Sequence, residues 1–187
     1  MLKFLFVISA CITLSSCSSS HYVQKQGNEI TVALDSLNWY LSFPDDDYVV
    51  EKEQISSDHK SGYFLFTHHS NFPIDTLFTV SFFIEPIKGC IDAKCCRDKA
   101  WEKEKTRLKN HTDVQLSEIG EAATFEYTLP DYFNYRSMNA HFFHEGYWID
   151  MHISRMLYEI GSQQSFVNLV KSIKLLPKAD LMNTVIR

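Results

Sequence analysis

The chain has 187 residues, of which 45% are hydrophobic and 14% aromatic, and its formal net charge at pH 7 is −5. A chain of this length forms one domain more often than two, and this apolar content favours a folded core over a disordered tail. Because acidic and basic residues are interspersed, the composition excludes a basic nucleic-acid-binding surface and a polybasic membrane patch.

The first 16 residues have the three-part pattern of a secretory signal. Lys3 precedes an apolar run over residues 4–14, which is shorter than the roughly 20 residues that a membrane-spanning helix needs. Two small residues and Cys17 follow. We predict a signal peptide over residues 1–16, the alternatives being an ordinary secretory signal without lipid or an anchor that is never cut.

The stretch Leu14-Ser15-Ser16-Cys17 resembles the lipobox of bacterial lipoproteins. The resemblance implies a covalent lipid on Cys17, which becomes the first mature residue, and no other cofactor is expected. It also places the protein on the periplasmic side of the bacterial cell envelope, and a serine after the cysteine is compatible with the outer membrane. Residues 17–28 are interpreted as the lipidated cysteine with a flexible tether, and residues 29–187 as a single globular domain.

Strands are predicted in the first part of this domain. Residues 30–43 alternate loosely and are rich in β-branched and aromatic residues, which indicates one or two strands before Pro44. The acidic run over residues 45–47 lacks the glycine and distal glutamate of a calcium loop. We therefore expect a solvated turn there, or the first turn of a short helix over residues 48–54. Two more strands are expected over residues 63–69 and 77–84.

A surface helix is predicted over residues 92–110, which are dense in Lys and Glu with apolar side chains at helical intervals. Asp92 is a plausible N-cap. In an oxidising compartment, Cys90, Cys95 and Cys96 predict one disulfide and one thiol. Adjacent cysteines rarely pair, so Cys90 is expected to bond to Cys95 or Cys96. Buried thiols and a metal or redox centre are the alternatives, although the spacing does not match a structural zinc site.

The remaining elements predict an α+β fold. Three or four antiparallel strands are expected over residues 114–119, 122–129 and 138–154. A helix beginning at Ser162 has a core-facing stripe, and an edge strand over residues 173–176 follows it. Strands with segregated helices indicate an antiparallel β-sheet covered by helices.

Two stretches resemble the PsbP-like proteins. WYLSFPDDDYVV, from Trp39 to Val50, is similar to their opening strand and proline-containing turn, and SFVNLVKSIKLL, from Ser165 to Leu176, is similar to their closing helix. The bacterial lipoprotein DcrB belongs to the same structural group. The resemblance implies a PsbP-like or DcrB-like α/β/α sandwich, and a binding, assembly or chaperone role rather than catalysis. The three-cysteine insert has no counterpart in that pattern.

The stretch HFFHEGYWIDMHIS, residues 141–154, is predicted to be a hairpin with a two-residue turn at Glu145-Gly146. Trp148 stands where a zincin motif needs its second histidine, and Gly146 breaks the helix that the motif requires. Side chains of a strand alternate between two faces, so half of the hairpin faces the core. The other face, which we expect to be exposed, carries His141, Phe143, Trp148, Asp150 and His152.

Exposed aromatics among polar groups favour protein recognition on this face. A cross-strand His–Asp hydrogen bond with aromatic pairing is the structural alternative. His141, Asp150 and His152 are also candidates for a metal site, or for a base with an orienting acid. We predict no catalytic residue and no metal ligand here.

The sequence therefore favours a lipid-anchored, non-enzymatic periplasmic binding protein, with the membrane and a protein as partners and no nucleic acid. One version is an immunity-type lipoprotein that neutralises a periplasmic toxin, and another is an envelope-assembly factor. The alternative is a metal- or small-ligand-binding periplasmic lipoprotein.

Overall fold

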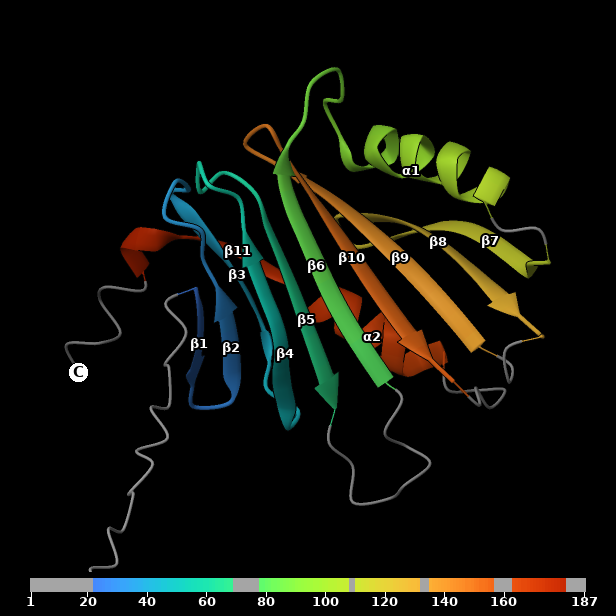
Figure 1. The fold of residues 1–187 in the computed structure, drawn as a ribbon, viewed down its shortest axis with the longest axis horizontal. Helices are drawn as coiled ribbons and strands as arrows, with labels where there is room; N and C mark the ends of the chain where they lie inside the picture. Colours follow the sequence, from blue (N-terminus) through green and yellow to red (C-terminus); the bar gives the residue numbers. More distant parts are fainter. Residues whose placement is uncertain (1–21, 69–77, 108–109, 132–134, 157–162, 181–187) are drawn as a thin grey trace, which may run out of the picture.

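The computed structural model describes residues 22–68, 78–107, 110–131, 135–156 and 163–180, in which two antiparallel sheets and two helices form (Figure 1). Cys17 and the predicted signal lie outside the described residues. The strands are β1 (Val23–Gln26), β2 (Glu29–Val32), β3 (Trp39–Pro44), β4 (Tyr48–Ile55), β5 (Gly62–His68), β6 (Phe78–Pro86), β7 (Thr112–Ile119), β8 (Ala122–Leu129), β9 (Tyr135–His144), β10 (Tyr147–Arg155) and β11 (Lys174–Pro177). The helices are α1 (Ala93–Arg107) and α2 (Gln163–Ser172).

The large sheet has seven strands in the order β4-β5-β6-β10-β9-β8-β7. Its inner face is built from large apolar side chains at every second position, because neighbouring residues of a strand point to opposite faces. Among those that are fully buried are Phe64, Phe66, Phe82, Ile84, Ile149 and Met151. The alternation in the sequence thus fixes which face of each strand turns inward.

The small sheet has the order β1-β2-β3-β11, and its first strand lies within the segment predicted to be a tether. The expectation of a flexible tether to residue 28 is wrong for Val23–Gln26, which pairs with β2 as strand β1. Gly27 adopts a φ of 58° in the turn between the two strands, a conformation that glycine takes without a steric penalty. Val23 is buried, so burial of an apolar side chain and a full hydrogen-bonded ladder stabilise this segment.

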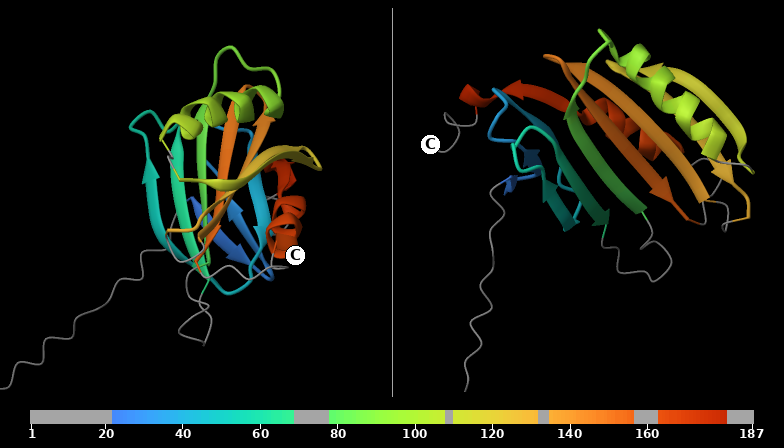
Figure 2. Two further views of the ribbon diagram at one scale, coloured as in Figure 1. Left: turned by 90° about the vertical axis from the view of Figure 1, so that its right-hand side faces the viewer. Right: turned by 45° about the horizontal axis from the view of Figure 1, so that its top comes forward.

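The core lies between the inner face of the large sheet and a second layer made of the small sheet and α2 (Figure 2). Phe166, Leu169 and Val170 of α2 belong to this core. Helix α1 lies on the opposite, outer face of the large sheet. The predicted α+β class with antiparallel sheets is confirmed, and the predicted edge strand at the end of the chain is β11. The layer opposite α1 contains a sheet as well as a helix.

Residues 48–54, one interpretation of which was a short helix, belong instead to strand β4. β4 is an edge strand that pairs with β5 and is bulged between Val50 and Lys52. Charged residues are common on edge strands, where they prevent further strand pairing, and here they imitate the composition of a helix. Pairing with β5 also buries Tyr48, which a solvated helix would expose.

Helix α1 begins as predicted. The Asp92 carboxylate accepts a hydrogen bond from the Cys95 backbone N–H at 2.7 Å, which satisfies one of the free amides of the first turn. Cys90 is bonded to Cys95, so of the two predicted pairings this one forms. Cys96 is a free, buried thiol.

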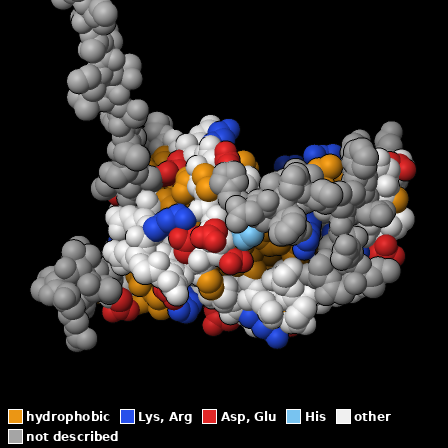
Figure 3. Space-filling view, turned by 90° about the horizontal axis from the view of Figure 1, so that it is seen from below, with side chains coloured by type: hydrophobic (Ala, Val, Ile, Leu, Met, Phe, Trp, Pro, Cys, Tyr) orange, Lys and Arg blue, Asp and Glu red, His pale blue; other side chains and the backbone are white. Residues whose placement is uncertain are grey.

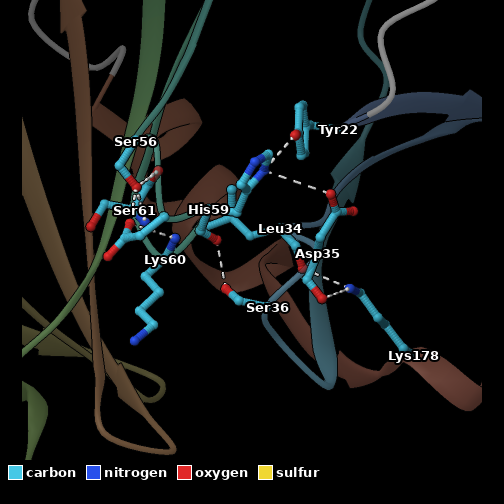
Figure 4. A network of polar contacts seen from close by, with 10 residues as sticks. Tyr22, Leu34, Asp35, Ser36, Ser56, His59, Lys60, Ser61 and Lys178 are labelled. Carbon is cyan, nitrogen blue, oxygen red and sulfur yellow. Dashed lines mark hydrogen bonds and ion pairs between the residues drawn. The ribbon is translucent and has the colours of Figure 1, made fainter.

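A polar network lies at the end of the molecule where Tyr22 precedes β1, and we call this the closed end (Figure 4). The Tyr22 hydroxyl lies 2.9 Å from His59 Nδ1 in the β4–β5 turn, and Ser36 donates to the His59 carbonyl at 2.6 Å. Lys178, just after β11, donates to the Leu34 carbonyl at 2.6 Å. These contacts join both sheets at this end. In the described ranges, no helix has the length and apolarity to cross a membrane.

Candidate functional site

The β9–β10 hairpin forms with the predicted register. His144 pairs with Tyr147 and His141 with Asp150, and the turn residues Glu145 and Gly146 have φ values of 48° and 82°. Two consecutive positive φ angles are those of the type I′ turn, whose twist matches the twist of the strands. The hairpin therefore presents the two predicted faces.

The face predicted for the core is buried. Ala140, Phe142, Ile149, Met151 and Ile153 all lie in the core cluster. At the end near the turn, His144 and Tyr147 pack edge-on against the buried Trp39 of the small sheet, with ring centroids 5.2 and 6.0 Å away. Half of the histidine-rich stretch thus serves to join the two sheets.

The other face, predicted to be exposed, is only partly accessible, because α1 covers it at β8 and β9. The exposure expected for His141 is wrong, since this side chain is 0% exposed. Its ring stacks on Phe125 with centroids 5.3 Å apart, and Phe125 in turn contacts Trp101 of α1 at 5.2 Å. The helix forms a lid over this half of the sheet.

Two polar groups lie near one nitrogen of His141, and one of them is hydrogen-bonded to it. Trp148 Nε1 donates to His141 Nδ1 at 3.0 Å, and Asp150 Oδ1 lies 3.3 Å from the same nitrogen. An acceptor role for Nδ1 assigns the neutral tautomer with its proton on Nε2. Burial lowers the pKa of His141 to about 3, which agrees with a neutral ring.

Asp150 lies on the outer face of the large sheet, between the part that α1 covers and the part that α1 leaves accessible. Its side chain is 31% exposed, yet Oδ1 is inaccessible and lacks a hydrogen-bond partner among the described residues. Burial, with smaller contributions from Glu104 and Glu85, raises the pKa of Asp150 to about 7. One carboxyl oxygen faces His141 while the group as a whole reaches the surface.

His152 is engaged in a separate contact. Its Nε2 lies 2.8 Å from the Ser137 hydroxyl, and burial lowers its pKa to about 4. His141 lies beside Asp150, whereas the Nε2 atom of His152 is taken up by Ser137. Within the residues that the structure describes, no group of three or more His, Cys, Asp or Glu side chains is placed to hold a metal ion.

The cysteine cluster anchors the lid. The Cys90–Cys95 disulfide ties the first turn of α1 to the segment that follows β6. Cys96 is fully buried beneath the helix, and burial raises the pKa of its thiol to about 11. A thiol with such a pKa is a packing group rather than a nucleophile at neutral pH.

The part of the outer face that α1 leaves open forms an aromatic patch, which we define as Tyr63, Leu65, Phe83, Glu85, Trp148 and Asp150. In Figure 1, α1 lies at the β8–β9 side of the large sheet, away from β4 and β5. Phe83 is 37% exposed, and the other members are partly exposed. Of the predicted binding residues, Trp148 and Asp150 belong to this patch and Phe143 adjoins it.

Four patch members come from β5 and β6, which the sequence interpretation did not connect to the hairpin. The signal that could have found them is alternation. In β6, Phe82 and Ile84 face the core, so Phe83 and Glu85 must face outward. Pairing of β6 with β10 then sets Phe83 opposite Asp150 and Glu85 opposite Trp148.

A second candidate site is an open cavity of about 730 Å³ at the end of the molecule opposite the polar network. The view from below shows hydrophobic side chains at the bottom of a hollow with acidic side chains and a histidine on its rim (Figure 3). Its lining comes from the ends of both sheets and from α2, and includes Tyr48, His68, Phe78, Arg155, Asn168 and Leu169.

No protein-family model matches the sequence, and no curated protein matches it. Among solved structures, the chain is similar to the solution structure of cyanobacterial PsbP (CyanoP) from Synechocystis sp. PCC 6803, with a TM-score of 0.47 and 10% sequence identity. The match covers 87% of this chain and 98% of that one. A likeness of this size describes the arrangement of the chain and carries no function from one protein to the other.

Proposed function

We propose that the protein is a lipid-anchored binding protein of the bacterial cell envelope, on the periplasmic side, with no catalytic chemistry of its own. The observation that carries the proposal is the aromatic patch beside α1. Partly exposed aromatic side chains, framed by charged groups, are the composition enriched at the centres of protein–protein interfaces.

The chemistry of the neighbouring polar groups supports binding over catalysis. A general base must come within hydrogen-bond reach of its substrate, and His141 is enclosed between Phe125 and Trp148. His152 is bound to Ser137. His141 therefore orients the indole of Trp148, and His152 links β10 to β9. The accessible part of the face consists of aromatic rings and carboxylates.

The anchor would hold the domain close to the membrane. Tyr22 is fixed in the polar network, and the five peptide units from Cys17 to Tyr22 span at most about 17 Å. A domain on such a short connection samples a thin layer above the lipid. Stable anchoring needs two or more acyl chains, because one chain alone holds a protein only marginally.

The anchor is tested by labelling cells with palmitate and separating their membranes. Wild-type protein is expected to carry the label and to sediment with the membranes, and Cys17→Ala to lose both properties. Wild-type protein without label, or a Cys17→Ala variant that keeps the label, would overturn the lipid anchor.

The binding surface is tested by photo-crosslinking in cells. A photoreactive residue at Tyr63 or Phe83 is expected to give one discrete adduct with another envelope protein, because both positions lie within the patch. The same residue at Gln115, on the distal edge strand β7, is the matched control. Equal adducts from all three positions would contradict a dedicated interface.

Within this class, an immunity-type lipoprotein and an envelope-assembly factor differ in the partner that the crosslink identifies. A secreted toxin as the adduct favours the first, and a resident envelope protein the second. The observation that supports the alternative, a small-ligand-binding lipoprotein, is the open cavity at the end opposite the polar network. Its volume lies in the range of small-molecule sites.

A further inference from the structure

Four outward side chains on β6 and β10 alternate between aromatic rings and carboxylates. Phe83 stands opposite Asp150, and Glu85 stands opposite Trp148. The rings occupy one diagonal of this square and the carboxylates the other. Directly opposed residues have Cβ atoms about 5 Å apart and diagonal residues roughly 7 Å, so each ring lies beside both carboxylates.

The aromatic row continues beyond the square. Tyr63 is the partner of Phe83 on β5, and Phe143 is the partner of Trp148 on β9. The ammonium group of Lys52 lies 5.8 Å from the centroid of the Tyr63 ring. Since the face of an aromatic ring carries partial negative charge, this contact is a cation–π interaction within the same surface.

The two carboxylates have little compensating positive charge. Burial raises the pKa of Glu85 as well as that of Asp150, and Lys103 of α1 is the cation that opposes both shifts. Lys103 is exposed, so its charge is screened by water. Asp150 Oδ1 is buried against His141, so the exposed part of this carboxyl group is the part that a ligand can reach. The square thus holds two carboxyl groups whose ionisation is opposed by burial, so a cation placed between them would favour their charged forms.

We propose that this square of Phe83, Glu85, Trp148 and Asp150 is a receptor for one arginine side chain of a protein partner. The inference rests on the proposed function and names the chemistry of its interface. A guanidinium group is planar, stacks on aromatic rings and donates to carboxylates in two directions, which suits rings and acids on crossed diagonals. A hard divalent metal would require about six oxygen ligands instead.

The bound cation would be coupled to the proton on Asp150. A cation stabilises the ionised carboxylate, so affinity is expected to increase as the pH rises from about 6 to about 8, through the raised pKa of Asp150. The groups that act on this carboxyl are Glu85 on β6, His141 on β9, and Cys96, Lys103 and Glu104 on α1. His141 stays neutral across this range because its pKa is about 3.

The test uses the full chain in a non-ionic detergent and N-acetyl-argininamide as the probe. The matched probe is N-acetyl-citrullinamide, which has the same shape without the charge. We expect millimolar binding of the argininamide, detected as a change in tryptophan fluorescence that a Trp148→Phe variant lacks, and roughly tenfold weaker binding of the citrullinamide. Equal binding of the two probes, or no binding of either, would overturn the cation receptor.

Variants assign the site. Glu85→Gln and Asp150→Asn are each expected to weaken argininamide binding several-fold, and Asp150→Asn to remove its dependence on pH. Lys103→Gln should tighten binding, because it removes the internal competitor. Glu102→Gln, an exposed acid of α1 outside the square, is the control. Unchanged affinity in both Glu85→Gln and Asp150→Asn contradicts the proposal.

The argininamide and crosslinking experiments distinguish the arginine receptor from the interface as a whole. If the argininamide does not discriminate charge but crosslinks from Phe83 still form one adduct, the patch binds a partner by apolar contact and the arginine receptor is wrong. If the crosslinks are also absent, the proposed interface is wrong as well.

Discussion

The hydrogen bond from Trp148 to His141 links a buried residue to a partly exposed ring. It contributes to the orientation of the indole, and it does so through a nitrogen that cannot carry a proton at the same time. The pKa of His141 is lowered to about 3 and that of His152 to about 4, so both rings are neutral in the folded protein. The unfolded chain binds protons at both rings below about pH 6.5.

Stability is therefore expected to decrease as the pH falls from about 6.5 to about 4.5, because the unfolded state takes up two protons that the folded state excludes. Asp150 acts in the opposite direction, since its raised pKa makes the folded state bind one proton more in this range. The two histidines outweigh one aspartate. The net slope is of the order of 1 kcal/mol per pH unit, measured by urea unfolding at several pH values.

His141→Asn tests this assignment, because asparagine also accepts a hydrogen bond from Trp148 but does not titrate. The variant is expected to lower stability at neutral pH and to flatten the pH dependence. An unchanged slope in His141→Asn would show that other groups cause the acid sensitivity.

At the scale of elements, α1 decides how much of the predicted face is available. The helix is held on the sheet by buried Cys96, by the contact of Trp101 with Phe125 of β8, and by Arg97, which donates to the Ser117 carbonyl of β7. Its first turn is held by the Cys90–Cys95 disulfide. Breaking this disulfide opens a ring of six residues, for which a chain-entropy model gives a loss of about 2 kcal/mol. We expect Cys90→Ala with Cys95→Ala to fold, with α1 less protected than the sheets.

Hydrogen exchange read out on α1 and on β6 separates a local loosening from a global one. Faster exchange in the first turns of α1 with unchanged exchange in β6 is the expected result. Added reductant should have no further effect on the double variant, which controls for other thiol chemistry. Equal acceleration in both elements would mean that the disulfide stabilises the whole fold and not the lid.

Much of each element could be predicted from sequence. The β9–β10 register followed from the Glu145-Gly146 turn, and the inward face followed from alternation. Local patterns could not show that α1 covers His141, because the helix is more than thirty residues away in the chain and its stripe of apolar side chains is weak. The mistaken helix at β4 has the same origin, since only pairing with β5 distinguishes it.

At the scale of the whole molecule, the two ends of the sandwich differ. Tyr22 belongs to the polar network that closes one end, while Asn28, in the turn after β1, lines the cavity at the other. Strand β1 thus separates the entry of the chain from the cavity by its own length. With a lipid on Cys17, the closed end would stand nearer to the membrane, and the cavity and the aromatic patch would remain accessible to soluble partners.

The cavity allows a test between the protein-binding and small-ligand alternatives. Tyr48, Phe78 and Leu169 give it an apolar floor, and a neutral apolar dye such as N-phenyl-1-naphthylamine is expected to bind there. Asn168 lines the cavity from the exposed side of α2, so Asn168→Trp should fill it without disturbing the core and should weaken dye binding about tenfold.

Lys171→Trp places the same bulk on α2 outside the cavity lining and is the matched control. Because the patch lies on the outer face of the large sheet and the cavity lies between the layers, the two sites share no residue, and their energetic effects should be independent. Asn168→Trp should therefore leave argininamide binding and the Phe83 crosslink unchanged. If it abolishes the crosslink while the fold is intact, the partner is recognised at the cavity, and the patch is not the interface.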